Sequence, residues 1–461
     1  MSVFKAYDIR GIAGTELDSE FAERLGRALA THLEAKCVSV VRDIRDSGPE
    51  YHAAFVKGLN AAGADVVDLG ISTTGVLYRS TVDLPVDVAV AITASHNPPE
   101  YNGYKICHGT MPLGGEDLQD IRRTFEAGDF RKGEGSYDTA EDYEESYIDA
   151  VIESVGKPAR DIRVALDCGN AVPGPLAVRL LERLGVDVIP VYCDWDNSFP
   201  NHPPDPTRPE NMIDLAQAVI EHGAEFGIGM DGDGDRLGVV DEQGRFIHPD
   251  RLMGIFAKDV LSNLPQDASE EQRTIFYDVK CSMALEEAIE GLGGVPRMVR
   301  TGHTFMKLEL RNHPTAPMAG EMSGHFFMND GWHGFDDALY NSARLLEIVG
   351  RDQSPERGGP KFSERFSFMP EYPTTNEGKV PLLGEREEVM AAVREAFSDM
   401  EFSTVDGIRV RYENGWYLCR PSNTEPILVM RAEGRNQETL ESILGDIESR
   451  IGHLVDLAEL R

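Results

Sequence analysis

The order of apolar and polar positions repeats three times along the chain. In each copy an amphipathic helical stretch ends at glycine, a short valine-rich strand follows, and a later apolar strand opens into a polar loop. The helices end at Gly63, Gly185 and Gly294, and the later strands lead into loops near 94–98, 231–236 and 320–325. The spacing differs between copies, which argues against a solenoid of fixed period. It favours three similar α/β domains, each with a mixed sheet between helices.

The pattern changes after about residue 366. Apolar positions at helical spacing predict helices over 387–397 and 440–454. Between them Asn414-Gly415 separates two apolar runs, which predicts a β-hairpin, and a further strand is expected at 427–430. These elements indicate a smaller α+β domain. We therefore expect four domains, at 1–150, 151–255, 256–365 and 366–461.

The three polar loops follow the carboxyl ends of predicted strands. Ligands bind beyond those ends in open α/β sheets. We therefore expect the three loops to share one cleft.

Charge and composition narrow the classes of partner. The 461 residues include 45 Lys and Arg against 79 Asp and Glu, a net charge of −34. A negative body repels nucleic acid and anionic membranes, so neither is expected as a partner, and an anionic substrate needs local Arg and Lys. The longest aliphatic run, 88–92, is too short to span a membrane, and the N-terminus lacks a basic-then-apolar leader. The six cysteines are scattered and form no C-x-x-C pair, so we expect free thiols. Together these features lead us to expect a cytoplasmic protein.

Asp231, Asp233 and Asp235 alternate with glycines, so a tight turn can aim three carboxylates at one point. Such hard oxygen ligands select Mg²⁺, Mn²⁺ or Ca²⁺. We reject an EF-hand because its loop needs glycine where this chain has Arg236, and because the flanking segments are predicted to be strands. The remaining alternative is a solvated acidic turn, in which the three carboxylates repel one another.

Ser95 lies where a predicted strand ends, in the segment T-A-S-H-N-P at 93–98. A serine there can simply cap a turn. No G-x-S-x-G motif surrounds it, so a hydrolase triad has little support. A serine hydroxyl beside a metal cluster is suited to carry a phosphoryl group, because the metal neutralises phosphate charge.

Two further loops carry groups suited to a sugar phosphate, although a simple turn is the alternative for each. The loop after residue 419 combines a guanidinium fork, hydroxyls and an amide, the inventory of a phosphate cradle. Its members are Arg420, Ser422, Asn423 and Thr424. Glu321 and Ser323 stand two residues apart and offer acceptors for vicinal sugar hydroxyls. Additional basic candidates, each with a routine surface explanation, are Arg10, Lys280, His303 and Lys307.

These four loops, in this order, resemble those of the α-D-phosphohexomutase family, specifically its phosphomannomutase/phosphoglucomutase branch. The resemblance covers essentially the whole chain, with a phosphoserine loop at 93–98, a metal loop at 231–236, a sugar loop at 320–325 and a phosphate loop at 420–426. It implies four domains around a central active-site cleft and a reaction that moves phosphate between O1 and O6 of a hexose. Phospho-Ser95 would donate to the sugar, a hexose 1,6-bisphosphate would form and turn around, and the other phosphate would return to Ser95. The same bisphosphate is the expected activator.

The resemblance also implies roles for individual residues. Mg²⁺ would be held by Asp231, Asp233, Asp235 and an oxygen on Ser95. Lys105 and His303 are the expected proton-transfer groups, with Arg236 near phospho-Ser95. Glu321 and Ser323 would bind sugar hydroxyls, and the loop at Arg420 would hold the distal phosphate. The full set expected to contact substrate is Tyr7, Arg10, Lys280, Glu321, Ser323, His325, Arg420, Ser422, Asn423 and Thr424.

Single side chains separate the branches of the family. Met322, His325 and Asn423 favour mannose or glucose, because a glucosamine enzyme is expected to have Gln between Glu321 and Ser323. The segment 72–75 departs from the proline-rich turn expected there. Phosphoglucosamine mutase, a metal-dependent sugar phosphatase and a non-catalytic sugar-phosphate-binding protein are the alternatives. We expect a small phosphosugar as the only partner, a monomer or weak homo-oligomer, and a last domain that acts as a mobile lid.

Overall fold

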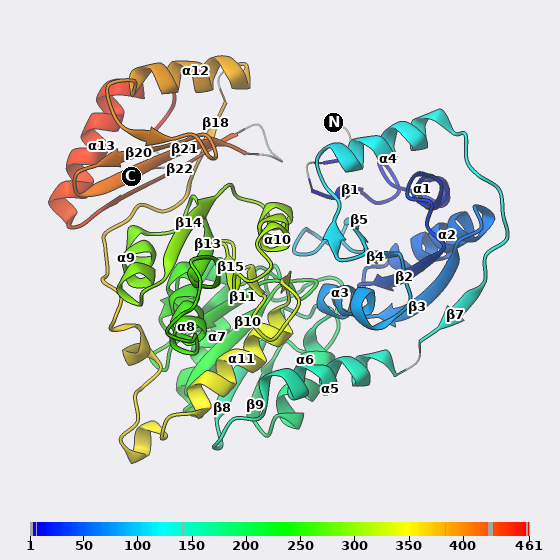
Figure 1. Ribbon diagram of the computed structural model, residues 1–461, viewed down its shortest axis with the longest axis horizontal. Helices are drawn as coiled ribbons and strands as arrows, with labels where there is room; N and C mark the ends of the chain where they lie inside the picture. The colour runs from blue at the N-terminus through cyan, green and yellow to red at the C-terminus, as the bar shows by residue number, and fades with distance from the viewer. Residues whose placement is uncertain are drawn as a thin grey trace.

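A computed structural model describes residues 3–5, 7–140, 142–382, 384–422, 427–457 and 460. Four β-sheets each take their strands from one contiguous stretch of the chain (Figure 1). Three are mixed sheets between helices, and the fourth is antiparallel. This confirms three similar α/β domains and a C-terminal α+β domain, called domains I to IV below.

Domain I has the strand order β1-β5-β4-β2-β3-β7, and β6 pairs with β5. Strand β4 is buried at every position, as expected for a central strand covered by helices on both faces. The strands are β1 Ile9–Ile12, β2 Cys37–Arg42, β3 Asp65–Ile71, β4 Val88–Ile92, β5 Tyr101–His108, β6 Met111–Pro112 and β7 Tyr137–Thr139. The helices are α1 Ser19–His32, α2 Gly48–Ala61, α3 Thr74–Asp83 and α4 Glu116–Ala127, and α5 Tyr143–Val155 leads from domain I into domain II.

Domain II has the order β12-β11-β10-β8-β9, and domain III the order β14-β13-β15-β16-β17. The strands are β8 Arg163–Asp167, β9 Asp187–Val191, β10 Phe226–Met230, β11 Leu237–Val240, β12 Phe246–Ile247, β13 Thr274–Asp278, β14 Val295–Val299, β15 Met318–Gly320, β16 Phe326–Met328 and β17 Phe335–Asp336. The helices are α6 Gly174–Arg183, η1 Pro209–Met212, α7 Ile213–His222, α8 Pro249–Ser262, η2 Glu271–Arg273, α9 Met283–Gly291, α10 His303–Asn312, α11 Ala338–Gly350, η3 Pro355–Arg357 and η4 Ser363–Phe366.

The three mixed sheets share one topology. In each, the first strand of the repeat (β2, β8 or β13) lies between two parallel neighbours, and the strand after the polar loop (β5, β11 or β16) returns antiparallel. The repeated apolar pattern therefore corresponds to a repeated fold. The polar loops follow β4, β10 and β15, at the carboxyl ends of the parallel strands.

Domain IV is an antiparallel sheet of order β18-β22-β21-β20-β19. The predicted hairpin at Asn414-Gly415 is confirmed, because β20 pairs with β21 in antiparallel register on either side of it. Helices α12 and α13 lie on the side of the sheet away from domain III (Figure 1). The strands are β18 Gly378–Pro381, β19 Phe402–Ser403, β20 Ile408–Tyr412, β21 Gly415–Pro421 and β22 Ile427–Gly434, and the helices are α12 Arg386–Ala396 and α13 Gln437–Ile451.

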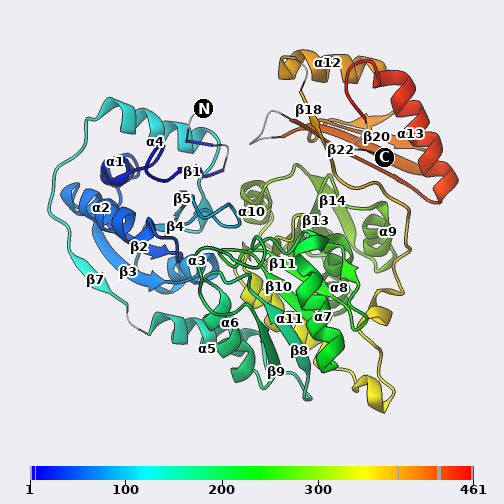
Figure 2. The same ribbon diagram turned by 180° about the vertical axis from the view of Figure 1, so that it is seen from behind.

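One cluster of buried side chains runs from domain II into domain III and into one side of domain I, and contains Leu77, Ile228 and Phe326. Domain I also has a core of its own, around Phe55 and Val90. Domain IV has a separate core around Val393 and Tyr417. Domains I and IV flank helix α10 of domain III when the molecule is seen from the front and from behind (Figures 1 and 2). Among the described helices, none has the length and apolarity needed to cross a bilayer.

Candidate functional site

The polar loops of domains I, II and III meet. Ser95 Oγ donates a hydrogen bond to Asp231 Oδ2 at 2.7 Å. On the other side of the metal loop, His325 Nδ1 lies 3.6 Å from Asp235 Oδ1. The three loops thus converge at the carboxyl ends of their sheets, as the sequence predicts.

The backbone of Ser95 is held in a sparsely populated conformation. Its φ is +51°, in the left-handed region that non-glycine residues rarely adopt. The buried guanidinium of Arg45 holds the loop by donating to the carbonyl oxygens of Ser95 (2.8 Å), Asn97 (2.6 Å) and Tyr101 (2.9 Å). Asp43 pairs with Arg45 at 3.0 Å and compensates its buried charge. No sequence motif singles out Arg45.

The metal loop approaches Ser95 closely because residue 232 has no side chain. A Cβ on Gly232 would lie 2.1 Å from the Ser95 carbonyl oxygen, so only glycine fits there. The Gly232 amide donates to the Pro204 carbonyl at 3.1 Å. Gly234 has a φ of +77°, which completes the tight turn between the carboxylates.

The three aspartates of this loop fit a metal ion. Their carboxylates offer oxygen atoms that lie within 4.8 Å of one another, and all three residues are buried. Oδ1 of Asp233 and Oδ1 of Asp235 have no hydrogen-bond partner among the described residues. Buried carboxylate oxygens without partners are unfavourable unless a cation joins them. A hard divalent cation matches this donor set.

Two residues of domain I reach across to these carboxylates. Lys105 Nζ lies 2.5 Å from Asp233 Oδ2 and 2.5 Å from Asp235 Oδ2. Burial opposes the charge on Lys105, but the carboxylates outweigh it and raise the pKa of this lysine. Thr74 Oγ1 donates to Asp233 Oδ2 at 2.6 Å, and the Thr74 amide donates to the Asp233 carbonyl at 3.0 Å. The 72–75 segment, which departs from the expected turn, therefore supports the metal loop.

Asp231 differs from its two neighbours. Burial, followed by repulsion from Asp235 and Asp233, raises the pKa of Asp231 well above its usual range. Burial has the same effect at Asp235, but Lys105 and His325 outweigh it and lower its pKa. The cluster therefore holds more negative charge than the nearby cations neutralise, which favours a bound cation.

Two histidines of domain III flank the buried carboxylate of Asp336. His325 Nδ1 lies 3.0 Å from Asp336 Oδ2, and Arg236 Nε donates to His325 Nε2 at 3.1 Å. The ring of His303 lies 5.7 Å from that of His325. His303 Nδ1 is 3.2 Å from the ammonium nitrogen of Lys307. Asp336 was not found by the sequence reasoning, because nothing in its spacing distinguishes it.

The sugar-loop residues are tied to the start of α10. Glu321 is 1% exposed, and its Oε1 accepts the Gly302 amide at 2.5 Å. Ser323 Oγ donates to Glu321 Oε2 at 3.3 Å. Tyr7, from domain I, donates to the Thr301 carbonyl at 3.1 Å, and burial raises the pKa of Tyr7 to about 12.

The basic residues expected at the site lie in different domains. Arg10 Nη1 donates to Asn97 Oδ1 at 2.6 Å, next to the Ser95 loop. Lys280, between β13 and α9, pairs with Glu377 at 3.2 Å. Arg236 stands 4.0 Å from Asp205, so its guanidinium links the metal loop to both Asp205 and His325.

Domain IV contributes a buried arginine. Arg420 Nε donates to Asp406 Oδ2 at 2.7 Å, and the same oxygen accepts the Thr301 amide of domain III at 3.1 Å. The backbone amide of Ser422 donates to the Ile427 carbonyl at 2.9 Å. Asn423 and Thr424 lie outside the described residues.

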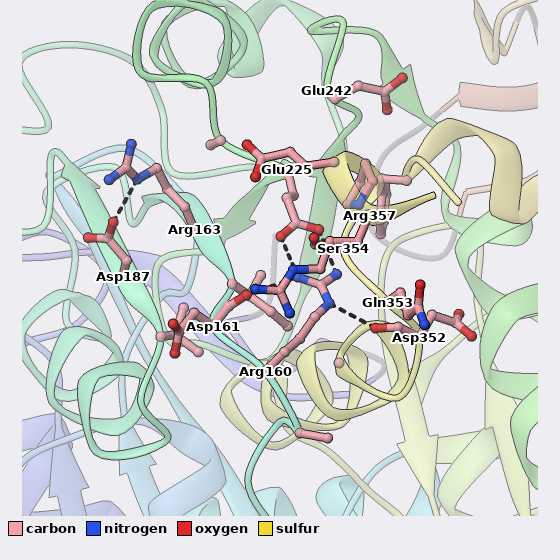
Figure 3. A pocket seen from close by; sticks show the side chains of 18 of the residues that line it. Arg160, Asp161, Arg163, Asp187, Glu225, Glu242, Asp352, Gln353, Ser354 and Arg357 are labelled. Carbon is pink, nitrogen blue, oxygen red and sulfur yellow. Dashed lines mark hydrogen bonds and ion pairs between the residues drawn. The ribbon is translucent and has the colours of Figure 1, made fainter. Parts of the chain in front are cut away.

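A wide groove of about 1510 Å³ lies away from these loops, at the amino ends of β8, β9 and β10 in domain II (Figure 3). Its charged side chains point mainly toward one another. Arg160 pairs with Glu225 at 2.6 Å, and Arg163 pairs with Asp187 at 2.6 Å. Because Asp231 follows the opposite end of β10, this groove is separate from the candidate site.

Four family models match the chain in order. The phosphoglucomutase/phosphomannomutase alpha/beta/alpha domains I, II and III match residues 1–132, 145–244 and 248–372. The C-terminal domain of the same family matches residues 377–449.

Relatives that align over nearly the whole chain carry the same family names as the domain models. The chain is 42% identical to a phosphomannomutase/phosphoglucomutase from Pseudomonas aeruginosa, over 96% of this chain and 94% of that protein. It is 40% identical to a phosphoglucomutase from Neisseria gonorrhoeae, over 96% and 95% of the two chains. A solved phosphoglucomutase/phosphomannomutase family protein from Burkholderia thailandensis superimposes with a TM-score of 0.90 at 38% identity, covering 98% of this chain and 97% of that one. With four domain models and full-length relatives in agreement, the chain belongs to the phosphoglucomutase/phosphomannomutase family.

Proposed function

We propose that this protein is a phosphohexomutase that interconverts hexose 1-phosphate and hexose 6-phosphate through phospho-Ser95 and a hexose 1,6-bisphosphate. The observation that carries the proposal is the contact between Ser95 Oγ and Asp231 in a buried acidic cluster, at the meeting point of three domains. The names of the relatives support a mannose or glucose substrate. The same bisphosphate, added in trace amounts, would phosphorylate Ser95 and activate the enzyme.

The residues that would hold Mg²⁺ are Asp231, Asp233, Asp235 and an oxygen on Ser95. When bound, the cation would neutralise charge on the transferring phosphoryl group. The protein's own cations add to this effect. Arg10 lies next to the Ser95 loop, and Lys105 and Arg236 lie next to the metal loop, so together with a bound cation they would offset the acidic cluster and attract the anionic substrate against the overall charge of −34.

Transfer to the sugar breaks the P–Oγ bond of phospho-Ser95 and forms a bond between phosphorus and a sugar oxygen. The sugar hydroxyl loses its proton to a base, and Ser95 Oγ takes up a proton as it leaves phosphorus, so the number of protons is unchanged over the step. The contacts favour His325 as that base. Its Nδ1 faces the carboxylates of Asp336 and Asp235, and its Nε2 accepts a hydrogen bond from Arg236, so Nε2 is unprotonated and can take a proton once Arg236 turns toward the phosphoryl group. Lys105 is a weaker candidate, because its ammonium is held between Asp233 and Asp235.

Substrate binding would span all four domains. Glu321 and Ser323 offer oxygen acceptors for sugar hydroxyls, and Arg420 with Ser422, Asn423 and Thr424 would bind the phosphate that is not reacting. Tyr7, Arg10, Lys280 and His325 complete the expected contacts, and His303 is the other histidine expected at the reacting group. After the bisphosphate forms, domain IV must loosen its hold on the ligand so that the intermediate can turn around.

The proposal is tested with purified protein, Mg²⁺ and a trace of hexose 1,6-bisphosphate, supplied separately with mannose 1-phosphate, glucose 1-phosphate and glucosamine 1-phosphate. Phosphorus NMR should show the 6-phosphate of mannose, glucose or both. Ser95→Ala should lower turnover by more than about a thousandfold, because the phosphoryl carrier is lost. Release of inorganic phosphate would indicate a phosphatase instead. Conversion of the glucosamine phosphate alone would move the protein to the other branch of the family.

A further inference from the structure

Lys307 is a fully buried lysine that the proposed reaction does not use. It lies one turn after His303 on α10, with 0% of its surface exposed. Its Nζ lies 2.5 Å from Asp336 Oδ1, donates to the Tyr78 hydroxyl at 2.8 Å and lies 3.2 Å from His303 Nδ1. The ring of Tyr78 also faces the ammonium, 4.3 Å from its centre. The carboxylate of Asp336 compensates the charge of this buried ammonium.

The three contacts determine the state of His303. An ammonium has three N–H donors and no acceptor, so every hydrogen bond that Lys307 makes is one that it donates. The His303 Nδ1 next to it must therefore be an unprotonated acceptor. A neutral imidazole with an unprotonated Nδ1 carries its single proton on Nε2. In agreement, burial and then the charge of Lys307 lower the pKa of His303 well below its usual value.

His325, whose ring lies next to that of His303, carries its proton on the other ring nitrogen. His325 Nδ1 lies near two carboxylates, 3.0 Å from Asp336 and 3.6 Å from Asp235, so Nδ1 carries the proton. Its Nε2 accepts from Arg236. The two rings are 5.7 Å apart, and Asp336 Oδ2 is a neighbour of both. It lies 3.0 Å from His325 Nδ1 but 3.9 Å from His303 Nδ1, whose nearer partner is the Lys307 ammonium at 3.2 Å. The ammonium of Lys307 leaves His303 with a protonated Nε2, which can donate a hydrogen bond. The carboxylate of Asp336 leaves His325 with an unprotonated Nε2, which can accept one.

We propose that Lys307 is a positioning residue that fixes His303 in the neutral Nε2–H tautomer. His303 then serves as a permanent hydrogen-bond donor to an oxygen of the hexose phosphate. The statement about the ligand rests on the proposed function, whereas the tautomer is a property of the protein alone. Tyr78 belongs to domain I and Lys307 to domain III, so the arrangement depends on the packing of these two domains.

The test reads the tautomer directly in the full-length protein labelled with ¹⁵N-histidine. Two-bond proton–nitrogen correlation spectra distinguish protonated from unprotonated ring nitrogens, and the His303 signals are assigned by their loss in His303→Gln. The wild type should show neutral His303 with the proton on Nε2. Lys307→Met should give a mixture of both tautomers. Tyr78→Phe is the matched control, because it removes one partner of Lys307 but leaves the ammonium beside His303, and it should leave the tautomer unchanged.

Two results would overturn the proposal: a proton on Nδ1 of His303 in the wild type, or an unchanged tautomer in Lys307→Met. If the single variant fails to fold, Lys307→Met combined with Asp336→Asn removes both buried charges and answers the same question. In kinetic assays, Lys307→Met should raise the KM for the hexose phosphate by roughly threefold to tenfold, the value of one hydrogen bond. An inactive wild type that still shows the Nε2–H tautomer would contradict the proposed function and leave the role of Lys307 toward His303 intact.

Discussion

At the scale of single residues, the acidic cluster is a balance of buried charges. Lys105 satisfies one oxygen on each of Asp233 and Asp235, and the second oxygen of each is left for a cation. Thr74 holds the carboxylate of Asp233 in place. Asp233 therefore offers one oxygen to a cation, and its other oxygen contacts both Lys105 and Thr74 of domain I.

Asp233→Asn should weaken metal binding and lower turnover, because the amide removes one anionic ligand and leaves Lys105 with a single carboxylate. We expect the Mg²⁺ concentration needed for half-maximal activity to rise by at least about tenfold. The measurement is a Mg²⁺ titration of mutase activity. Asp187→Asn is the matched control, since Asp187 pairs with Arg163 on the exposed opposite end of the domain II sheet. Equal metal requirements in Asp233→Asn and wild type would contradict the assignment.

The sequence predicts the acidic loop well and its supporting residues poorly. Asp231, Asp233 and Asp235 lie within five positions, so their convergence follows from local geometry. The contact of Ser95 with Asp231 follows from the rule that places loops at the carboxyl ends of strands. Arg45 and Asp336 act through tertiary contacts that join distant segments, and neither their types nor their spacing differ from those of ordinary surface residues. Lys307 is one of the basic candidates, but its contacts with Tyr78 and Asp336 could not be read from the sequence.

At the scale of elements, the proline-rich excursion at 194–211 supports the metal loop. The carbonyl of Pro204 accepts the amide of Gly232. The excursion is held to the end of β8 by His202, whose Nε2 lies 3.0 Å from Asp167. Burial opposes the charged form of this histidine, but the contact with Asp167 outweighs it and raises the pKa of His202.

This shift gives a pH-dependent stability with a defined sign. A histidine whose pKa is raised by folding stabilises the folded state at low pH, and the stabilisation is lost as pH rises through the folded pKa. His202→Asn should therefore lower the free energy of unfolding more at about pH 5.5 than at about pH 8.5, which lie on either side of the usual histidine pKa. The expected difference is about 1 kcal/mol. Thermal unfolding at the two pH values measures it, with His453→Asn, an exposed histidine after α13, as the control. A larger loss at the higher pH would refute the interpretation.

The elements themselves were mostly predictable. The repeated helix–strand–loop pattern predicted the shared topology, because buried parallel strands produce continuous apolar runs. Strand β7 was missed. Its three residues, Tyr137 to Thr139, are all exposed and lie in the charged stretch 134–145, so neither alternation nor hydrophobicity marks them. It forms only because β3 offers an unpaired parallel edge.

At the scale of the molecule, domain IV is attached to domain III through apolar, aromatic and charged contacts. Trp416 and Leu418 pack on Val279 of domain III. Glu433 accepts from the Trp416 indole at 2.8 Å and from the Met283 amide at 2.9 Å. Near the candidate site, Asp406 joins Arg420 to Thr301.

Asp406→Asn should weaken substrate binding, because the neutral amide no longer orients the buried Arg420 or holds domain IV at the start of α10. Loss of a charge-assisted hydrogen bond costs about 1.5–3 kcal/mol, which predicts a KM for the hexose phosphate that is roughly tenfold to a hundredfold higher. Steady-state kinetics measures it. Asp399→Asn is the matched control, since this aspartate pairs with Arg450 in the same domain and is exposed. A KM equal in both variants would argue against a role for Asp406 in orienting Arg420.

The division of the hydrophobic core has a consequence for how the molecule comes apart. Domains II and III share one cluster of buried side chains that also reaches one side of domain I, so a local opening in either of them disturbs the other and the side of domain I packed against them, even though domain I has a second core of its own. Domain IV keeps its own core and can fray or melt while the other three remain folded. Substitutions in the domain IV core, for example at Ile447, can therefore change the stability of this domain alone. The stability of domain IV can then evolve without changes to the cores of the other three domains.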